Sequence, residues 1–523
     1  MNTATWTDSA PLRERALGLW AWPAAVALAL LLAIVSGGSS HAGSDVFLLF
    51  RLLCLALLAA SLIRLITTSI ALTEKLALLL IIAAVSLVSL QLVPLPYAVF
   101  TSLPGREFVA KVFEIASIPP QPMPLTLSAD ATRGALLALM PPIAIFLATL
   151  TTGQRQRWLL VATILVGSIA NVFLGLAQRF EGAGSGLYLY EITNYGSATG
   201  FFSNRNNFAM LLCIAIPLTW AATHKLIRMR SLSPPLGIAA GAVMMLIIFM
   251  GLAASNSRSG IFLGMLALTL STLMVVATPA AKGRSSRSAK RGRLSLLAIL
   301  GGAFIIGQFG MTGILRIVEN DPLTDYRTEI RDVTLRSAAD YFPIGSGFGT
   351  FQSVYGMHET PATMISAYVN HAHNDWLELW LEGGLPAATL MGCFVALFVY
   401  QAVRVWNPSG QYAEHVLPRA ASVGALVLLL HSLVEFPLRM PALACIFAAF
   451  IAMLMAPAQR HQAHHRRSRG PERREQPGVD VEEIQHAPIA VTPPRFHVSR
   501  QQDELPPRGE AAAPASIERK RQR

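Results

Sequence analysis

The sequence predicts an all-α polytopic membrane protein with about twelve transmembrane helices. Its 523 residues are 53% hydrophobic and 14% charged, and the mean hydropathy of +0.48 is too high for a soluble globular protein. Apolar runs of about 17 to 25 residues, long enough to cross a bilayer, recur along the chain. They lie near residues 17–36, 46–66, 76–93, 134–152, 158–177, 207–223, 235–254, 259–278, 294–314, 385–403, 420–436 and 441–457.

Basic residues gather in alternate loops between these runs, and they predict the orientation of the chain. Short loops rich in Lys and Arg stay in the cytoplasm. On that side we expect Arg13, Arg15, Arg64, Lys75, Arg155, Arg157, Lys225, Arg228, Arg230 and the basic residues of 282–293. Both termini are then cytoplasmic. The opposite side of the membrane, which is the periplasm if the cell is Gram-negative, would hold the loops 94–133, 178–206, 255–258, 315–384 and 437–440.

The composition divides the chain into a predicted transmembrane domain, residues 1–457, and a predicted disordered basic tail in the cytoplasm, residues 458–523. The tail is rich in Arg, Glu, Gln, Pro and His and cannot bury enough apolar surface to order itself. Inside-positive loops and this tail explain the net charge of +12, so no nucleic-acid partner is expected. The four cysteines sit singly inside apolar runs, which argues against disulfides and zinc–thiolate sites.

The external loop 178–206 ends in GFFSNRNNFAML, residues 200–211, where an apolar helix begins. Ser203 or Asn206 is a suitable N-cap, and the free N–H groups of a capped helix attract anions. Arg205 adds a cation, which favours an anionic or sugar ligand. A polar loop with a good cap explains the same residues, and the sequence leaves both interpretations open.

The tight external turn SNSRSG, residues 255–260, places Arg258 at the membrane face on the side where basic residues are rare. A snorkelling arginine is one explanation. The turn is too short to need a cation for solvation alone. We therefore favour contact with a phosphate, whose oxygens match the geometry of a guanidinium.

The long external loop 315–384 is predicted to contain a short amphipathic helix over residues 325–338. Ile330, Val333 and Leu335 supply its apolar positions among charged residues, a pattern that suits a helix on the membrane surface.

Arg327 and Arg331 lie one turn apart on this predicted helix and share a face. They are candidates for binding a phosphate. Pairing with Asp325, Glu329 and Asp332 in a solvated, salt-bridged face is the alternative.

Three glycines, Gly345, Gly347 and Gly349, follow in FPIGSGFGTF, residues 342–351. Their spacing is similar to part of a dinucleotide-binding fingerprint, but no βαβ unit surrounds them. We expect them to permit a sharp turn.

The segment NHAHNDWLELWLEGGLP, residues 370–386, contains His371 and His373. Histidine titrates near neutral pH, which suits a general base or a group that orients an acceptor. Asn374 is placed to fix the ring tautomer or the acceptor. A His-x-His pair also suits a metal, but no third ligand follows at a recognisable spacing. A hydrogen-bonded structural histidine is the remaining alternative.

The segment HSLVEFPLRMP, residues 431–441, brings His431, Glu435 and Arg439 to the same outer face. Ionisable groups at membrane depth are functional candidates. A mutual Glu435–Arg439 pair would explain two of them without any function.

Together these segments resemble the O-antigen ligase and polymerase superfamily of bacterial membrane glycosyltransferases. The resemblance extends over most of residues 90–457, with a ligase-like core at about 199–441. The ligase pattern of His-Asn, nine residues and Gly is met by His373, Asn374 and Gly384. The remaining matches are LQLVPLP (90–96), TGFFSNRNNFA (199–209), SRSG (257–260), YRTEIR with FPIGSGFGTF (326–351), NHAHNDWLELWLEGGLP (370–386) and HSLVEFPLRMP (431–441).

The resemblance implies an all-helical fold like that of the C-type glycosyltransferases, with a large periplasmic loop and a periplasmic active site. Such enzymes move a glycan from undecaprenyl diphosphate to an acceptor hydroxyl and need no metal or nucleotide cofactor. By motif match, Arg258 and Arg327 would hold the diphosphate and His373 would activate or orient the acceptor. Further substrate-binding positions are His371, Arg331, Arg205, Asn374 and Asn206.

Several functions remain open at this point. A ligase would join a finished polymer to an acceptor such as lipid A core, whereas a polymerase would extend an O-antigen or exopolysaccharide. A protein such as a pilin is a third kind of acceptor. A polysaccharide flippase would have a similar number of helices, but it predicts charges scattered within them, and here the candidate groups crowd one external face.

Overall fold

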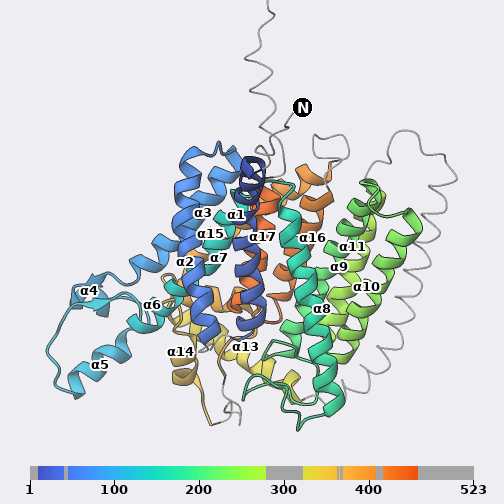
Figure 1. Ribbon diagram of the computed structural model, residues 1–523. Coiled ribbons are helices and arrows are strands. Elements are labelled where there is room, and N and C mark those ends of the chain that lie inside the picture. Colours follow the sequence, from blue (N-terminus) through green and yellow to red (C-terminus); the bar gives the residue numbers. More distant parts are fainter. Residues whose placement is uncertain are drawn as a thin grey trace, which may run out of the picture. The chain divides into compact units, whose positions relative to one another are not determined.

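The computed structural model describes residues 10–39, 45–277, 322–361, 364, 369–407 and 416–456. Contacts divide the chain into two units, Met1–Gln459 and Arg460–Arg523. The predicted tail lies outside the described residues. The described residues of the first unit form mainly helices with one short pair of strands (Figure 1), and the predicted all-α polytopic fold class is confirmed.

Within the described residues, seven helices are long and apolar enough to cross a membrane. They are α2 (Asp45–Thr67), α3 (Leu72–Leu90), the continuous pair α6 (Ala129–Ala138) and α7 (Met140–Leu150), α8 (Arg157–Glu181), α9 (Arg205–Arg228), α10 (Pro234–Ala254) and α15 (Asp375–Trp406). Shorter apolar stretches occur in α1 (Ala10–Ser36), α11 (Arg258–Ala277), α16 (Val416–His431) and α17 (Pro441–Met455). The predicted run 294–314 lies outside the described residues, and the predicted count of about twelve is not confirmed.

Helix α9 is the centre of one group of helices and packs against α8, α10, α11 and α16 (Figure 1). Its residues from Asn207 to Thr219 are all buried. A helix that is apolar on every side needs apolar surroundings on every side, and these neighbours provide them. In a second group, α7 packs against α2 and α17, while α1 contacts α2, α8 and α17.

Shorter elements lie at one end of the long helices (Figure 1). They are α4 (Tyr97–Thr101), α5 (Glu107–Ile115), α13 (Pro322–Asp340), α14 (Phe351–His358), the 3₁₀ turn η1 (Pro437–Arg439) and a two-stranded antiparallel pair of β1 (Pro94–Leu95) with β2 (Met123–Pro124). They connect to the long helices through the loops that the sequence predicts to be external.

Helix α13 confirms the predicted helix over 325–338 and extends it at both ends. Ile330 and Val333 are buried in a small apolar cluster with Tyr341 and Leu381. Leu335 lies on another face, with 49% of its residue surface exposed, and the predicted contact of this helix with the membrane surface stays a prediction. At 3.6 residues per turn, a position five residues after Ile330 points away from the buried face.

Helix α15 is interrupted at Gly384, which has φ 55° and ψ −147°. The glycine-rich loop fills the interruption, since Leu385 N donates to Pro343 O at 2.8 Å and Gly347 N donates to Glu382 O at 2.9 Å. These bonds satisfy backbone groups that a broken membrane helix would otherwise leave without partners. The expected turn is confirmed, because φ is 86° at Gly345, 116° at Gly347 and 82° at Gly349.

Gly384→Ala is expected to destabilise the protein by about 3 kcal/mol, because the new side chain meets both a left-handed backbone and a close contact. A Cβ at Gly384 would overlap Pro343 O and lie 2.7 Å from the carbonyl carbon of Ile344. Thermal unfolding of the purified protein measures the loss. Gly392→Ala is the matched control, since a Cβ there meets nothing within 4 Å. An equal effect of both changes would contradict this explanation of the break.

Candidate active site

The carboxylate of Glu435 joins three of the segments that the sequence singles out. This side chain is fully buried in the connection between α16 and α17. Its Oε1 accepts hydrogen bonds from Asn206 Nδ2 at 2.5 Å and from Arg327 Nη2. Its Oε2 lies 3.1 Å from His373 Nδ1. One side chain therefore brings together the start of α9, helix α13 and the loop before α15.

A fourth segment is attached through Asn206. Ser257 Oγ donates to Asn206 Oδ1 at 2.7 Å, so both ends of this amide are engaged. Ser257 is buried and immediately precedes Arg258, the first residue of α11. The turn that carries Arg258 is thus connected to Glu435 by two consecutive hydrogen bonds.

His373 occupies an unusual backbone conformation at this meeting point. Its φ is 49°, in the left-handed region that non-glycine residues seldom adopt, and such strain tends to be retained at functional sites. An ionised carboxylate only accepts hydrogen bonds, so Nδ1 of His373 donates to Glu435. In the neutral ring this leaves the lone pair on Nε2. The side chain is 25% exposed and is therefore accessible to a ligand.

Arg327 combines a fixed position with partial exposure. Glu435 engages one terminal nitrogen, and the side chain remains 38% exposed. A guanidinium has five N–H donors, so others remain for a ligand. Arg331 differs, because it pairs with Asp332 at 3.0 Å and its side chain is 56% exposed. The solvated-face alternative therefore describes Arg331 but not Arg327.

The environment of Glu435 keeps its carboxylate ionised. Burial alone raises the pKa of Glu435, but the charge and hydrogen bond of His373 and the charge of Arg327 outweigh it and lower the pKa to about 2. Glu435 consequently remains an acceptor throughout the neutral pH range, as its contacts with Asn206, Arg327 and His373 require.

The lowered pKa of Glu435 predicts an acid-dependent stability. Because the pKa of Glu435 lies below its ordinary value of 4.5, the ionised carboxylate stabilises the fold fully above pH 4.5. This stabilisation is lost as the pH falls toward 2. The free energy of unfolding of wild type should exceed that of Glu435→Gln by about 3 kcal/mol at about pH 6. This difference should shrink at about pH 3. Thermal unfolding at both pH values measures it. Glu114→Gln, at an exposed position on α5, should show no such narrowing.

Arg439 is the centre of a second charged group, next to the first. It lies 2.9 Å from Glu382, 3.3 Å from Glu378 and 3.9 Å from Asp375, which share one face of the first turns of α15. Burial lowers the pKa of Arg439, but these carboxylates outweigh it and raise the pKa above its usual value. The alternative of a mutual Glu435–Arg439 pair is therefore contradicted, because the two side chains have different partners.

The second group holds the loop that carries both histidines. Glu378 accepts from Ala372 N at 3.0 Å and lies 3.0 Å from His371 Nδ1. His371 and His373 thus face different carboxylates, and the ring of Phe436 lies 4.5 Å and 5.0 Å from their centroids.

Asn374 and Asn206 both lie at the beginning of a helix, but only Asn374 is an N-cap. Asn374 Oδ1 accepts from Trp376 N at 3.1 Å and Leu377 N at 3.0 Å, which caps α15. At α9 the cap is Asn204, whose side chain accepts from Asn206 N at 2.8 Å. The expected caps Ser203 and Asn206 were therefore wrong.

Arg205 is the first residue of α9, and its backbone N donates to Asn194 Oδ1 at 2.9 Å. Any role of Arg205, Asn206 or Asn374 in binding substrate stays a prediction.

Sequence reasoning did not identify the central roles of Glu435 and Gln91. Gln91 Nε2 donates to Glu382 O at 3.1 Å, and its Oε1 accepts from Phe348 N at 2.8 Å, so it fastens the glycine-rich loop to α15. Its position in LQLVPLP, one of the matching motifs, was the available signal. Glu435 also lay within a motif, but nothing in the sequence indicated its partners.

Comparison with known proteins agrees with the motifs. A family model described as O-antigen ligase matches residues 243–392, which include Arg258, Arg327, His373 and Gly384. No curated protein matches the chain. The match covers the turn before α11, helix α13 and the first half of α15, whereas Asn206 and Glu435 lie outside it. Residues 243–392 are therefore similar to the O-antigen ligase family, and the apolar helices of the described residues indicate a multi-pass membrane protein.

Proposed function

We propose that the protein is an O-antigen ligase that transfers a glycan from undecaprenyl diphosphate to an acceptor hydroxyl at the periplasmic face of the inner membrane. The family match supports a membrane enzyme of ligase or polymerase type in surface polysaccharide synthesis. The observation that most supports the finer assignment is the shared contact of Glu435 with His373 and Arg327. It puts a base and a cation in reach of one another.

The proposed reaction uses His373 as the base. Nε2 of His373 takes the proton of the acceptor hydroxyl as its oxygen attacks the anomeric carbon of the donor sugar. The bond from that carbon to the diphosphate oxygen breaks, and its electron pair stays on the departing undecaprenyl diphosphate. Attack from the face opposite to the diphosphate would invert the configuration. A positioned base contributes about 10² to 10⁴ in rate.

Arg327 and Arg258 would stabilise the departing diphosphate. Two guanidiniums near a partly buried site supply the positive charge that the leaving group requires, and electrostatic effects are stronger there than in water. Arg327 is already oriented by Glu435. Arg258 directly follows Ser257, which donates a hydrogen bond to Asn206. In this arrangement His371 and Arg331 take supporting positions around the substrate.

A polymerase is the second candidate, because the motifs belong to both branches of the superfamily. We place the ligase first because the matching family is described as O-antigen ligase. The acceptor would be lipid A core for a ligase and a growing polysaccharide for a polymerase. A flippase is less well supported, because the candidate site residues His373, Arg327 and Arg439 gather around buried carboxylates at one end of the helices rather than along a path through them.

Deleting the gene and sizing the glycans on undecaprenyl diphosphate tests this function. A ligase predicts that long polymer accumulates on the lipid carrier and does not reach its acceptor, whereas a polymerase predicts single repeat units there. Complementation with Arg258→Ala should fail, while Arg336→Ala, a more exposed arginine of α13, should restore the glycans. Unchanged glycans after deletion would exclude both candidates.

A further inference from the structure

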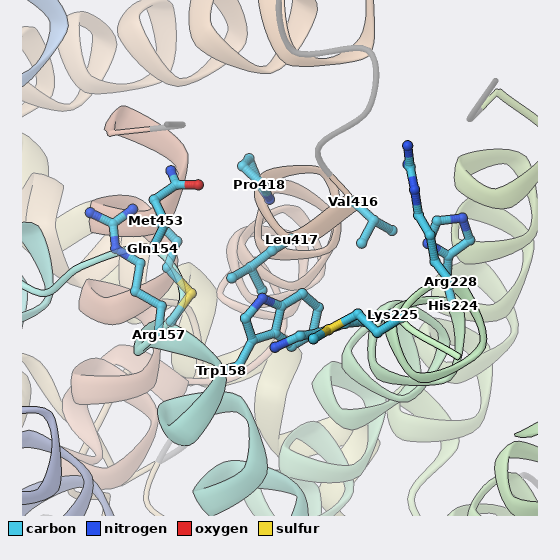
Figure 2. Close-up of a pocket in the computed structure, with 11 residues that line it drawn as sticks. Gln154, Arg157, Trp158, His224, Lys225, Arg228, Val416, Leu417, Pro418 and Met453 are labelled. Carbon is cyan, nitrogen blue, oxygen red and sulfur yellow. The ribbon is translucent and has the colours of Figure 1, made fainter. Parts of the chain in front are cut away.

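A cavity of about 360 Å³ lies among α8, α9, α16 and α17, far from Glu435. Figure 2 shows the side chains that line it. Helix α9 starts beside Glu435 at Asn206 and reaches the cavity at Lys225. At 1.5 Å per residue the two sites are about 30 Å apart. The cavity therefore lies toward the opposite membrane face, which the basic loops predict to be cytoplasmic.

Basic side chains dominate this cavity. Arg157, His224, Lys225 and Arg228 line it, and the described lining residues include no Asp or Glu. The ammonium of Lys225 lies 4.2 Å from the centroid of the Trp158 ring, a cation–π contact that holds it in place (Figure 2). Arg228 lies beside His224 in the same view. The cavity consequently presents several positive groups to one small volume.

Arg157 is fixed in the cavity wall by backbone carbonyl oxygens at the ends of the neighbouring helices α7 and α17. Its Nη1 donates to Ala456 O at 2.7 Å, Nε to Thr152 O at 3.1 Å and Nη2 to Leu150 O at 3.3 Å. These acceptors carry no net charge, so the guanidinium still contributes its positive field to the cavity. An anion would enter a site whose cations are already positioned.

We propose that this cavity binds the phosphate group of an anionic membrane lipid. Its walls are the ends of membrane helices, the depth at which phospholipid headgroups lie, and basic pockets of this kind suit them. Trp158 is of the residue type enriched at that depth. Met229, Leu417 and Met453 supply apolar wall for the adjoining glycerol and acyl chains. This site goes beyond glycan transfer and does not depend on it.

The test compares two double variants of the full chain. Lys225→Gln/Arg228→Gln removes two charges from the cavity. Lys75→Gln/Arg155→Gln also removes two charges, from exposed positions on the same predicted side of the membrane. Neither residue lines the cavity. Binding of phosphatidylglycerol to the detergent-purified proteins is measured by native mass spectrometry, with phosphatidylcholine as the neutral lipid. Inorganic phosphate, at constant ionic strength, is tested separately by thermal shift.

Wild type and the control are expected to bind phosphatidylglycerol about tenfold more tightly than the cavity variant. If the cavity variant binds only inorganic phosphate more weakly than wild type, and binds phosphatidylglycerol equally well, the cavity takes a soluble phosphate and the lipid assignment is overturned. Equal binding by all three proteins in both assays would overturn the site itself. Unfolding temperatures in phosphatidylcholine verify folding, and Arg228→Gln alone, at an exposed position, serves if the double variant does not fold.

Discussion

His373→Ala is expected to reduce glycan transfer by about 10² to 10⁴, because it removes the proposed base while its carboxylate partner remains. The loss should appear in the rate at saturating donor and acceptor, since a base acts in the transition state more than in substrate binding. Transfer per folded molecule is the quantity to measure, with thermal unfolding of the same preparation as the check on folding.

His358→Ala is a closely matched control for this change. His358 lies on α14, its side chain is also 25% exposed, and its Nε2 lies 3.0 Å from the carboxylate of Asp340. Its ring nitrogens face Val354 O and Asp340, whereas Glu435 binds His373. We expect near wild-type transfer. A comparable loss per folded molecule in both alanine variants would contradict a specific role of His373 as the base.

Glu435→Gln should reduce transfer by about 10⁴, comparable to losing the carboxylate that orients a catalytic histidine elsewhere. The substituted amide can still accept through one oxygen, but its NH₂ group would face a donor of Asn206, Arg327 or His373. Both the ring orientation of His373 and the position of Arg327 would then be lost. Glu435 is a positioning residue in this account, because it acts through these partners.

A double variant separates positioning from a merely structural role. If Glu435 acts largely through His373, Glu435→Gln/His373→Ala should transfer little more slowly than His373→Ala alone, because residues that act as a unit are not additive. Glu378→Gln is the comparison, since Glu378 is also buried and lies 3.0 Å from the other histidine, His371. It should lower stability with a much smaller loss per folded molecule. Fully additive losses in the double variant would contradict the positioning role.

The helices and the turn of the glycine-rich loop were accessible from the sequence because they depend on local properties. Hydropathy predicts apolar helices, and glycine tolerates the positive φ of Gly345, Gly347 and Gly349. The role of Gly384 was accessible only as part of a motif. Its need for glycine arises from Pro343 and Ile344, which reach it through the fold.

The contacts within the candidate site were not accessible from local patterns. Glu435 lies 229 residues from Asn206 and 108 from Arg327 along the chain, and spacing says nothing about partners so distant. A Glu435–Arg439 pair, the alternative considered from the sequence, would suit the four-residue spacing of an α-helix. Instead α16 ends at His431, and the 3₁₀ turn η1 directs Arg439 toward α15.

The mistaken cap of α9 has a similar origin. Several Ser and Asn residues precede the helix, and each has suitable chemistry. Asn204 is the cap because its backbone is extended, with φ −123° and ψ 125°, immediately before the first helical residue. That choice frees the amide of Asn206 to connect Ser257 with Glu435.

The most direct measurement is glycan transfer by the purified protein in lipid nanodiscs, with undecaprenyl-diphosphate-linked glycan and lipid A core as substrates. We expect wild type to move the glycan to the acceptor and to release an equal amount of undecaprenyl diphosphate, whereas His373→Ala should do neither at a comparable rate. Transfer by His373→Ala at the wild-type rate would contradict the proposed site. Failure of wild type to transfer to lipid A core, or to a growing polysaccharide offered in its place, would contradict the proposed activity.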